Sequence, residues 1–482
     1  MSDTDVLIVG GGISGLASAW WLARRGLGVE VWECAPRAGG KIGTDNIAGY
    51  LNERAAALAL NYRPEVAQLL TESGLDAYKA TPLTGRRYLV HQNRLVPVPA
   101  RLGEMVTSPL WSCGAKLRLL LEPFIPRGNR EDETVSEFIT RRLGREPLEK
   151  AMEPYVSGTL ASDPDRTNAE AVLPRLTALE RRYGSLAVGA LLQRVRSRRR
   201  ACPTESFSFA GGMSTLIDAL ARTPGLGLRL GRAVNALAPE GTDGWSVSGT
   251  SAQGAHVLKA RHVVLSVPAG VAASLLQSLD PELARLLGGI EYSPVCVIHF
   301  GFDRSAVRHP LNGVGFLTAR EPGQPLNGVL WISTLFPDRA PAGKVLLTCY
   351  LGGARAPHVV DWNGERVVSA ALRGLRRLLG LSADPEMVQI DRHHQALPLY
   401  YGVYLGRTKR INARLERFPG LHLAANYIGG VSVRDRIAGG CEVADRILSV
   451  AGRLPPAPAG RPARTPAEIS AMSRAAEMRL EH

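Results

Sequence analysis

Residues 5–33 read DVLIVGGGISGLASAWWLARRGLGVEVWE, in which an apolar run, a glycine-rich turn, a longer stretch and a second apolar run follow one another. The first run, Asp5–Val9, is typical of a buried parallel strand. The Ala- and Leu-rich stretch Leu16–Arg25 predicts a helix that ends near Gly26, and Val29–Glu33 predicts the next strand. A strand, turn, helix and strand in this order is the unit from which doubly wound α/β folds are built.

The turn of this unit carries the spacing G-x-G-x-x-G at Gly10, Gly12 and Gly15. Gly10 allows a sharp turn, Gly12 lets a pyrophosphate approach the backbone, and Gly15 lets the helix close on the strand. Glu33, at the end of the second strand, is placed to accept a hydrogen bond from a ribose hydroxyl. The sequence therefore predicts a dinucleotide at the helix N-terminus, and a glycine-rich turn without a ligand is the alternative.

A second glycine-containing element follows the second strand directly. Residues 33–41 have the pattern E-x-x-x-R-x-G-G-K, with Arg37, Gly39, Gly40 and Lys41 at its fixed positions. A glycine pair lacks Cβ atoms and allows close backbone approach, and the guanidinium offers charge-assisted hydrogen bonds to phosphate. A basic loop that only caps the strand is the alternative.

The chain has 482 residues and a mass of 51.8 kDa, so two or three packed units are expected. Its formal charge of +14 favours an acidic partner, which includes nucleic acid, anionic lipid and carboxylate-bearing substrates. No run reaches the roughly 18 to 20 apolar residues that a membrane span needs, and no secretory signal opens the chain. The scattered cysteines favour a reduced, intracellular protein without a metal. They are Cys34, Cys113, Cys202, Cys296, Cys349 and Cys441.

The pattern at residues 33–41 resembles that of the FAD-containing superfamily of amine oxidases, phytoene desaturases and protoporphyrinogen oxidases. The resemblance implies FAD rather than NAD, with Arg37 and the paired glycines along the pyrophosphate and flavin side. A second strand, turn and helix at Pro419–Ala425, Asn426–Val433 and about Asp435–Val450 would bring another helix N-terminus to the flavin ring. The predicted FAD site is therefore discontinuous in sequence.

Further segments are similar to protoporphyrinogen and coproporphyrinogen oxidases. Residues 153–158 (EPYVSG) and 161–164 (ASDP) match stretches that those enzymes share. Residues 328–337 (GVLWISTLFP) and 350–353 (YLGG) match two more, and the whole match runs from about residue 5 to residue 450. The resemblance implies an α/β (α+β) fold: a Rossmann-like FAD-binding domain with a mixed-sheet substrate domain and a helical membrane-associated segment.

Four parts of the chain are expected from this resemblance and from composition. The discontinuous FAD-binding domain comprises residues 1–90, 205–268 and 415–450, and its first range also includes part of the substrate-binding side. Residues 91–204 form a helical segment for membrane contact and substrate, 269–414 a substrate-binding domain, and the Pro/Ala-rich residues 452–482 a flexible tail.

One segment supports membrane contact on its own account. Pro109–Ile125 places apolar and aromatic residues beside Lys116 and Arg118, as an interfacial helix would, although a buried helix hairpin gives the same pattern. The basic run Arg194–Arg200 suits anionic lipid, nucleic acid or a solvated helix end, and nucleic acid has only the charge to support it. We expect a cytoplasmic protein that binds no nucleic acid and lies peripherally on the inner face of the cell membrane. A homodimer is one oligomeric state left open.

The resemblance also implies roles for individual residues. Gly158 would face the reactive carbon of the substrate, and Tyr350 would stack over a pyrrole. Val314 and Leu317 would hold the macrocycle through apolar contacts, and Arg101 would bind a propionate. The implied cofactor-binding residues are Gly10, Gly11, Gly12, Ile13, Ser14, Gly15, Glu33, Cys34, Arg37, Gly39, Gly40, Lys41, Ala55, Ala56, Val234, Asn426, Val431, Ser432 and Val433.

The implied activity is FAD-dependent oxidation of a porphyrinogen, either protoporphyrinogen IX or coproporphyrinogen III, to the porphyrin. The resemblance places this reaction in haem biosynthesis, with the tetrapyrrole as partner and oxygen as electron acceptor. Because the flavin carries the hydride transfer, no catalytic residue of the protein and no metal is expected.

Two loops depart from the family pattern. After Glu53 the family continues E-x-G-P with a polar residue beside the flavin, whereas this chain has Ala55–Ala57. Later, Leu399, Val403 and Tyr404 replace Gln, Gly and His. These changes keep two alternatives open. One is a diverged flavin-dependent oxidase or desaturase that acts on another apolar, carboxylate-bearing metabolite, and the other is a non-catalytic protein that binds FAD or a tetrapyrrole.

Overall fold

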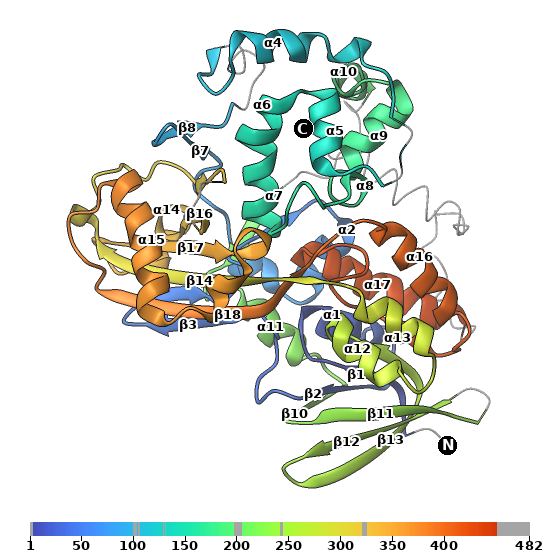
Figure 1. The fold of residues 1–482 in the computed structure, drawn as a ribbon. Coiled ribbons are helices and arrows are strands. Elements are labelled where there is room, and N and C mark those ends of the chain that lie inside the picture. The colour runs from blue at the N-terminus through green and yellow to red at the C-terminus, as the bar shows by residue number, and fades with distance from the viewer. Residues whose placement is uncertain are drawn as a thin grey trace.

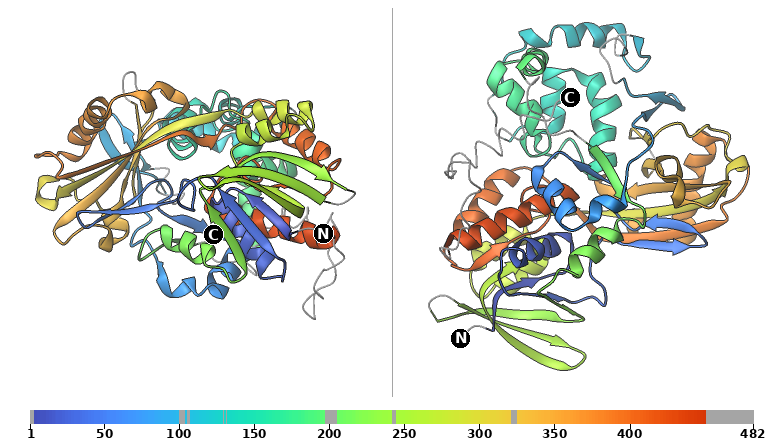
Figure 2. Two further views of the ribbon diagram at one scale, coloured as in Figure 1. Left: turned by 90° about the horizontal axis from the view of Figure 1, so that it is seen from below. Right: turned by 180° about the vertical axis from the view of Figure 1, so that it is seen from behind.

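The computed structural model describes residues 3–99, 104, 107–128, 130, 132–196, 205–241, 244–320 and 325–450. In these residues the chain forms two seven-stranded sheets and a group of helices (Figure 1). Figure 2 shows the first sheet and the group of helices at opposite ends of the molecule, with the second sheet beside them. Arg101 and the predicted tail of residues 452–482 lie outside the described residues.

The predicted strand, turn, helix and strand unit forms the centre of the first sheet. Strands β1 (Thr4–Val9) and β2 (Val29–Glu33) pair in parallel. Helix α1 (Ile13–Ala23) begins directly after Gly12 and so starts and ends earlier than predicted. The strand order is β10–β2–β1–β13–β12–β11, with β19 beside β13. The remaining strands are β10 (Leu226–Leu230), β11 (Ala233–Glu240), β12 (Gly244–Ser251), β13 (Gly254–Leu265) and β19 (Leu421–Leu423).

Helices cover both faces of this sheet. Successive side chains of a strand point to opposite faces, so Val6 and Leu7 of β1 lie in two different apolar cores. On the Val6 face lie α1, α2 (Pro64–Glu72), α11 (Ser214–Ala221) and α17 (Val433–Val450). On the Leu7 face lie α12 (Ala269–Leu276), α13 (Pro281–Gly288) and α16 (Tyr404–Leu415). Helices α1 and α17, from opposite ends of the chain, pack side by side (Figure 1).

The second sheet has the order β18–β14–β17–β16–β15–β7–β8, and its pairs are antiparallel except β15 with β7. Its strands are β7 (Arg87–His91), β8 (Arg94–Pro97), β14 (Tyr292–Asp303), β15 (Gly315–Leu317), β16 (Leu326–Trp331), β17 (Lys344–Gly352) and β18 (Met387–Pro398). Helix α15 (Gly364–Leu379) buries its apolar side against the sheet. The hairpin of β3 (Thr44–Ile47) and β4 (Tyr50–Glu53) contacts the sheet, because Tyr50 packs with Leu346 and Met387.

The helical segment, residues 113–196, lies at the far end of the molecule from β11–β13 (Figure 1). Its elements are α4 (Cys113–Leu120), η2 (Glu122–Phe124), α5 (Val135–Arg142), α6 (Arg145–Pro147), η3 (Leu148–Met152), α7 (Glu153–Leu160), α8 (Ala169–Val172), α9 (Pro174–Tyr183) and α10 (Leu186–Arg196). The predicted helix of Pro109–Ile125 is thus shorter than expected and is followed by the separate turn η2. Among the described residues, no helix combines the length and apolar character that crossing a membrane requires.

Two segments pack differently from the predicted boundaries. Strand β8 falls within the predicted helical range 91–204 but extends the second sheet. Helices α12 and α13 fall within the predicted range 269–414 but cover the first sheet. The smaller elements are β5 (Ala59–Asn61), β6 (Lys79–Ala80), β9 (Glu205–Phe209), α14 (Ile332–Leu335), η1 (Leu75–Tyr78), η4 (Arg304–Ala306), η5 (Pro337–Arg339), η6 (Gly353–Arg355) and η7 (Pro357–Asp361).

Candidate functional site

The three glycines of the turn after β1 have different surroundings. A Cβ at Gly10 would lie 2.6 Å from the Ser266 carbonyl oxygen, and the φ of +105° at Gly10 favours glycine. A Cβ at Gly15 would lie 2.0 Å from the Gly10 carbonyl oxygen, because α1 closes tightly on β1. A Cβ at Gly12 would meet no described protein atom within 4 Å. The fold therefore requires Gly10 and Gly15, whereas Gly12 leaves its backbone open to a ligand.

The loop after β2 lies against this turn. The Gly39 amide donates to the Gly11 carbonyl oxygen over 2.8 Å, and a Cβ at Gly40 would lie 3.3 Å from the Gly12 Cα. The two glycine-containing elements therefore meet at the N-terminus of α1, where Ile13 and the following residues begin the helix. A helix N-terminus whose first turn is open at Gly12 suits an anionic pyrophosphate.

Glu33 ends β2 beside this turn and is 7% exposed. Its Oε2 accepts the amide of Gly11 over 2.6 Å, and its Oε1 accepts the amide of Ala35 over 2.8 Å. Burial and the neighbouring Glu33 raise the pKa of the Cys34 thiol, which keeps that thiol protonated. The carboxylate is thus held in place by backbone donors. Its Oε1 also accepts the Cys34 thiol over 3.4 Å, so Oε2 is the oxygen that keeps a lone pair for a further donor.

Arg37 and Lys41 differ in how far their charges are already paired. The Arg37 guanidinium donates to the carbonyl oxygens of Ile42 (2.9 Å) and Gly40 (2.6 Å), so Arg37 shapes its own loop. The Lys41 amine lies 5.9 Å from the centre of the Tyr292 ring, and no acidic side chain among the described residues pairs with it. Burial lowers the pKa of Lys41 to about 8. A bound anion would supply the counter-charge that this amine lacks.

The second glycine-rich turn leads into α17 as predicted, although the helix begins at Val433 rather than Asp435. The Ser432 hydroxyl caps the helix by accepting the Asp435 amide over 3.3 Å. The Tyr292 hydroxyl donates to Asn426 Oδ1 over 3.4 Å, which links this turn to the ring that lies under Lys41. The predicted residues Asn426, Val431, Ser432 and Val433 all lie in this turn or at the first position of α17.

Arg436, in the first turn of α17, is a residue that the sequence did not single out. It is 4% exposed, and its guanidinium donates to the carbonyl oxygens of Ala425 and Ile428. Arg436 therefore fixes the turn between β19 and α17 from inside the protein. The run of basic and acidic residues at the start of α17 gives no local signal that distinguishes Arg436 from its less buried neighbours Arg434 and Asp435.

The alanine loop, Ala55–Ala57, is built into both parts of the molecule. Ala57 is 5% exposed and packs in the same core as Tyr50 and Leu346, whereas Ala56 packs on the core of the first sheet. Ala55 does not have the positive φ that would require glycine. His393 on β18 holds the loop, with Nε2 2.7 Å from the Arg54 carbonyl oxygen. The loop thus replaces the Gly-Pro turn of the family with a packed turn of ordinary backbone conformation.

Glu53, two residues before this loop, connects the β3–β4 hairpin to η5 and to the residue before α11. It is 3% exposed, its Oε1 lies 3.2 Å from Arg339 Nη1, and it accepts the Met213 amide over 2.9 Å. Its other oxygen accepts the Thr44 hydroxyl over 2.8 Å. Burial raises the pKa of Glu53 to about 7 even though the charge of Arg339 opposes the shift. Sequence reasoning noted Glu53 but did not identify its partner on η5.

Three of the predicted substrate residues come close together. Leu317 on β15 is opposite Gly328 on β16, and Gly328 is opposite Tyr350 on β17, so these positions share one face of the sheet. A Cβ at Gly158 on α7 would lie 2.5 Å from Leu317 Cδ2. Gly158, Leu317, Gly328 and Tyr350 therefore form a continuous surface, which we call the substrate wall. Val314 lies just before β15, where it accepts the Trp331 amide over 2.9 Å.

Two other positions of interest are Tyr404, near the second glycine-rich turn, and Val234, in the first sheet. Tyr404, which stands where the family has His, is 5% exposed and donates its hydroxyl to the Tyr427 carbonyl oxygen. Burial raises the pKa of Tyr404 far above its ordinary value, so it acts as a donor. Val234 lies on β11 at a register shift between Val234 and Ala236, and packs on the core of the first sheet.

Comparison with known proteins identifies the family of this site. The flavin containing amine oxidoreductase family matches residues 13–448. Protoporphyrinogen oxidase 2 of Arabidopsis thaliana is 31% identical, over 93% of this chain and 94% of that protein. Coproporphyrinogen III oxidase of Propionibacterium freudenreichii is 30% identical, over 96% of this chain and 94% of that protein. The Bacillus subtilis enzyme of the same name is 27% identical, over 91% and 97%.

Solved structures share the same architecture. A protein from Exiguobacterium sp. 255-15, which carries a provisional protoporphyrinogen oxidase name, superposes with a TM-score of 0.78 at 24% identity. The match covers 93% of this chain and 99% of that one. Reduced UDP-galactopyranose mutase superposes with a TM-score of 0.70 at 16% identity, over 94% and 95% of the two chains. These likenesses confirm the predicted α/β (α+β) fold.

Proposed function

Because the chain belongs to the flavin containing amine oxidoreductase family and is an FAD-dependent oxidoreductase, we propose that it oxidises a porphyrinogen to the porphyrin in haem biosynthesis. The observation that carries this proposal is the match over nearly the whole chain to porphyrinogen oxidases from a plant and from two bacteria. Those relatives act on either protoporphyrinogen or coproporphyrinogen by name, so the proposal includes both substrates.

The residues present fit FAD. The N-terminus of α1 beside Gly12 would hold the pyrophosphate, because the space next to the Gly12 backbone is open. Glu33 would accept from the ribose, and the Lys41 amine, which lacks an acidic partner among the described residues, would face the anionic cofactor. The turn Asn426–Val433 would border the flavin ring. The remaining predicted cofactor residues, including Arg37 and Ala55, would contribute by shaping these loops.

Bound FAD supplies a hydride acceptor. The proposed reaction removes six hydrogens in three two-electron steps, each of which takes a hydride from a methylene bridge of the porphyrinogen and releases a proton. Tautomerisation moves the remaining bridge hydrogen to nitrogen, and in each step oxygen takes up the two electrons and two protons as hydrogen peroxide. The chain itself would hold the flat macrocycle against the substrate wall, where Leu317 and Tyr350 offer an apolar surface and Gly158 lets Leu317 pack closely against α7.

The proposed partners beyond the substrate are oxygen, a membrane surface and a second copy of the chain. Release of hydrogen peroxide during turnover would support oxygen as the electron acceptor. The homodimer stays a prediction, and light scattering of the FAD-loaded protein would decide it.

We expect protoporphyrinogen IX or coproporphyrinogen III to bleach the bound flavin when either is mixed with the enzyme without oxygen. Readmission of oxygen is then expected to restore the flavin colour and to release a fluorescent porphyrin and peroxide. The measurement is the visible flavin absorbance, followed for each substrate separately. If both porphyrinogens leave the flavin oxidised in a protein that contains stoichiometric FAD, the diverged oxidase becomes the better assignment.

Exposed apolar side chains gather on the helical segment and support the proposed membrane contact. Leu120 of α4 and Phe124 of η2 are 74% and 82% exposed, so the alternative of a buried helix hairpin is wrong for these residues. Leu191 of α10, which packs beside η2, is 64% exposed. Together Leu117, Leu120, Leu121, Phe124, Val188, Leu191 and Leu192 form what we call the apolar patch. A patch of this kind is typical of a surface that meets a membrane or a protein.

A Leu120→Glu/Phe124→Glu variant is expected to bind anionic liposomes at least about tenfold more weakly than the wild type, because each apolar side chain buried at the interface contributes about 1.5–3 kcal/mol. Flotation with anionic and neutral liposomes measures the effect. Val257→Glu is the matched control, since Val257 is 65% exposed on β13 at the other end of the molecule. Equal flotation of the double variant and the wild type would assign the patch to another partner.

A further inference from the structure

A largely, but not fully, buried ion pair joins the first residue of α7 to the turn after β17. Glu153 and Arg355 have side chains that are 14% and 10% exposed, and Oε1 of the first pairs with Nη2 of the second. The other oxygen of Glu153 accepts the amide of Arg320 over 3.2 Å, and Arg355 Nη1 donates to the Thr318 carbonyl oxygen over 3.2 Å. One ion pair therefore fastens α7, η6 and the chain directly after β15 to one another.

These three anchored segments continue into the three elements of the substrate wall. Gly158 lies on α7, which begins at Glu153, and Leu317 is the residue before Thr318. Tyr350 lies on β17, which runs directly into the η6 turn. A movement at the ion pair would therefore displace the helix and both strands that build the wall.

Burying this ion pair costs more free energy than a contact that only holds segments together would require. Burial raises the pKa of Glu153 and lowers the pKa of Arg355, so each charge has lost hydration that its partner only partly replaces. Arg355 Nε is buried and has no hydrogen-bond partner among the described residues. An apolar pair of similar size could hold the same segments at lower cost, but it would not fix their direction. The chemistry of this contact therefore points to geometric control.

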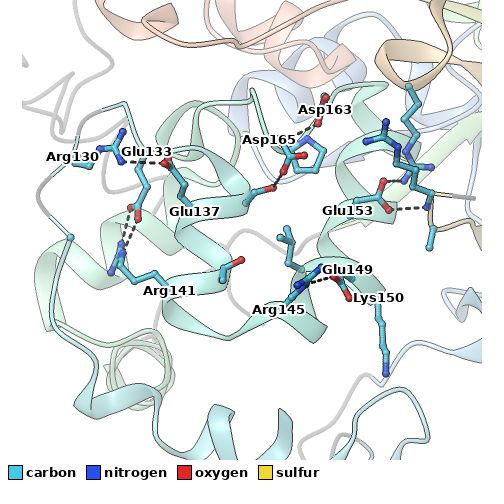
Figure 3. Close-up of a pocket in the computed structure, with 18 residues that line it drawn as sticks. Arg130, Glu133, Glu137, Arg141, Arg145, Glu149, Lys150, Glu153, Asp163 and Asp165 are labelled. Atoms are coloured by element: carbon cyan, nitrogen blue, oxygen red, sulfur yellow. Dashed lines mark hydrogen bonds and ion pairs between the residues drawn. The ribbon is translucent and has the colours of Figure 1, made fainter. Parts of the chain in front are cut away.

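The outer side of the pair borders a charged cavity of about 1140 Å³ (Figure 3). Several other cations of this cavity pair with acids of the helical segment itself. These pairs are Arg130 with Glu137, Arg141 with Glu133, and Arg145 with Glu149. Figure 3 shows that Glu153 lies on the side of the cavity away from Arg141. The Glu153–Arg355 pair differs from those pairs because it connects the helical segment to the second sheet.

We propose that Glu153 and Arg355 are positioning residues that set the spacing between α7 and strands β15 and β17, and thereby the fit of the macrocycle against the substrate wall. This inference rests on the proposed function for its substrate. The pair does not touch the reacting atoms, and it acts through Gly158, Leu317 and Tyr350.

We expect Glu153→Gln and Arg355→Met each to raise the KM for the porphyrinogen by about tenfold while FAD content and kcat change little, because a displaced wall weakens binding. The double variant is expected to be no worse than either single variant, since the two residues act as a unit. Glu149→Gln is the matched control, because Glu149 lines the same cavity but pairs with the exposed Arg145. Arg355→Lys keeps a charge for Glu153 and is expected to be intermediate.

Hydrogen exchange of residues 314–320 gives a readout that does not depend on turnover, and it is expected to rise in Glu153→Gln but not in Glu149→Gln. Unchanged KM in Glu153→Gln, with wild-type turnover established, would overturn the positioning role and leave the proposed function intact. If the wild type oxidises no porphyrinogen, the proposed function fails. In that case, unchanged hydrogen exchange of residues 314–320 in Glu153→Gln would show that the ion pair does not control the substrate wall. Raised exchange in that variant would support such control.

Discussion

A Gly12→Val variant is expected to fold normally and to contain no FAD, whereas a Gly15→Val variant is expected not to fold stably. The two glycines belong to one motif, but the structure gives them different roles. At Gly12 the φ is −74° and a Cβ meets no described protein atom within 4 Å, so the valine side chain would occupy only the space that the pyrophosphate needs. At Gly15 a Cβ would lie 2.0 Å from the Gly10 carbonyl oxygen, and backbone of β1 cannot move away cheaply.

The cost of Gly15→Val should exceed about 3 kcal/mol, the upper end for adding bulk to a packed interior, because the clash is with backbone rather than with a flexible side chain. Far-UV circular dichroism, thermal unfolding and flavin released by acid measure the two effects separately. Gly406→Ala is a suitable control, since a Cβ there meets nothing within 4 Å and Gly406, on α16, does not have a positive φ. Wild-type FAD content in Gly12→Val would show that the cofactor does not approach this turn.

The local part of the dinucleotide site could be predicted from sequence because its signals are short in range. Gly10, Gly12 and Gly15 precede a helix and follow a strand within one continuous stretch, and the structure places the Gly39–Gly40 loop against them. The predicted start of α1 was late because Ile13–Gly15 carry no apolar periodicity of their own. Their helical conformation follows from the turn at Gly12, and the helix propensities of the individual residues do not indicate it.

The parts that could not be predicted depend on partners far apart in the chain. His393 contacts the Arg54 carbonyl oxygen, and Arg339 pairs with Glu53, but nothing near either residue in sequence marks it as a partner. The alanine loop looked like a loss of a required turn. The structure shows instead that a turn without glycine is possible there, since Ala55 has an ordinary φ. Tertiary packing determines such positions, and a single sequence carries no signal for it.

A buried charge network in the helical segment sets up the second large effect. Glu122 and Arg142 are 1% and 0% exposed and form an ion pair. The Glu122 carboxylate also accepts the Leu186 amide over 2.9 Å and the Ser185 hydroxyl over 2.5 Å, at the start of α10. Arg142 donates to the Ile125 carbonyl oxygen over 2.8 Å. The network thus joins η2 to α10, the two elements that carry much of the apolar patch.

Glu122→Gln is expected to cost about 3 kcal/mol of the stability of the helical segment, the lower end for breaking a buried ion pair. It removes the closer of the two acids that pair with the buried Arg142 and leaves only Glu180, at 3.5 Å. The expected result is an earlier first transition in urea and faster proteolysis within residues 113–196. Glu122→Gln/Arg142→Met is expected to recover part of the loss, since no unpaired charge remains. Glu149→Gln, in an exposed pair of the same segment, should leave the transition where it is. If the first unfolding transition of Glu122→Gln occurs at the same urea concentration as that of the wild type, the role assigned to the Glu122–Arg142 ion pair is wrong.

The pH dependence of this loss has a definite sign. Burial alone would raise the pKa of Glu122, but the hydrogen bonds from Ser185, Leu186 and Ala187 and the charge of Arg142 outweigh it and hold the pKa below 4.5 in the folded state. The unfolded chain therefore binds this proton more readily, so the stabilisation is fully present above pH 4.5 and is lost as the pH falls through the folded-state pKa. The difference in unfolding free energy between the wild type and Glu122→Gln should accordingly be largest near neutral pH and should shrink on acidification. Urea titrations of both proteins from neutral to acidic pH measure this difference in unfolding free energy. Subtracting one value from the other cancels the contributions of the carboxylates that both proteins contain. A difference that grows toward acid would mean that desolvation, rather than the ion pair and the helix amides, dominates at Glu122.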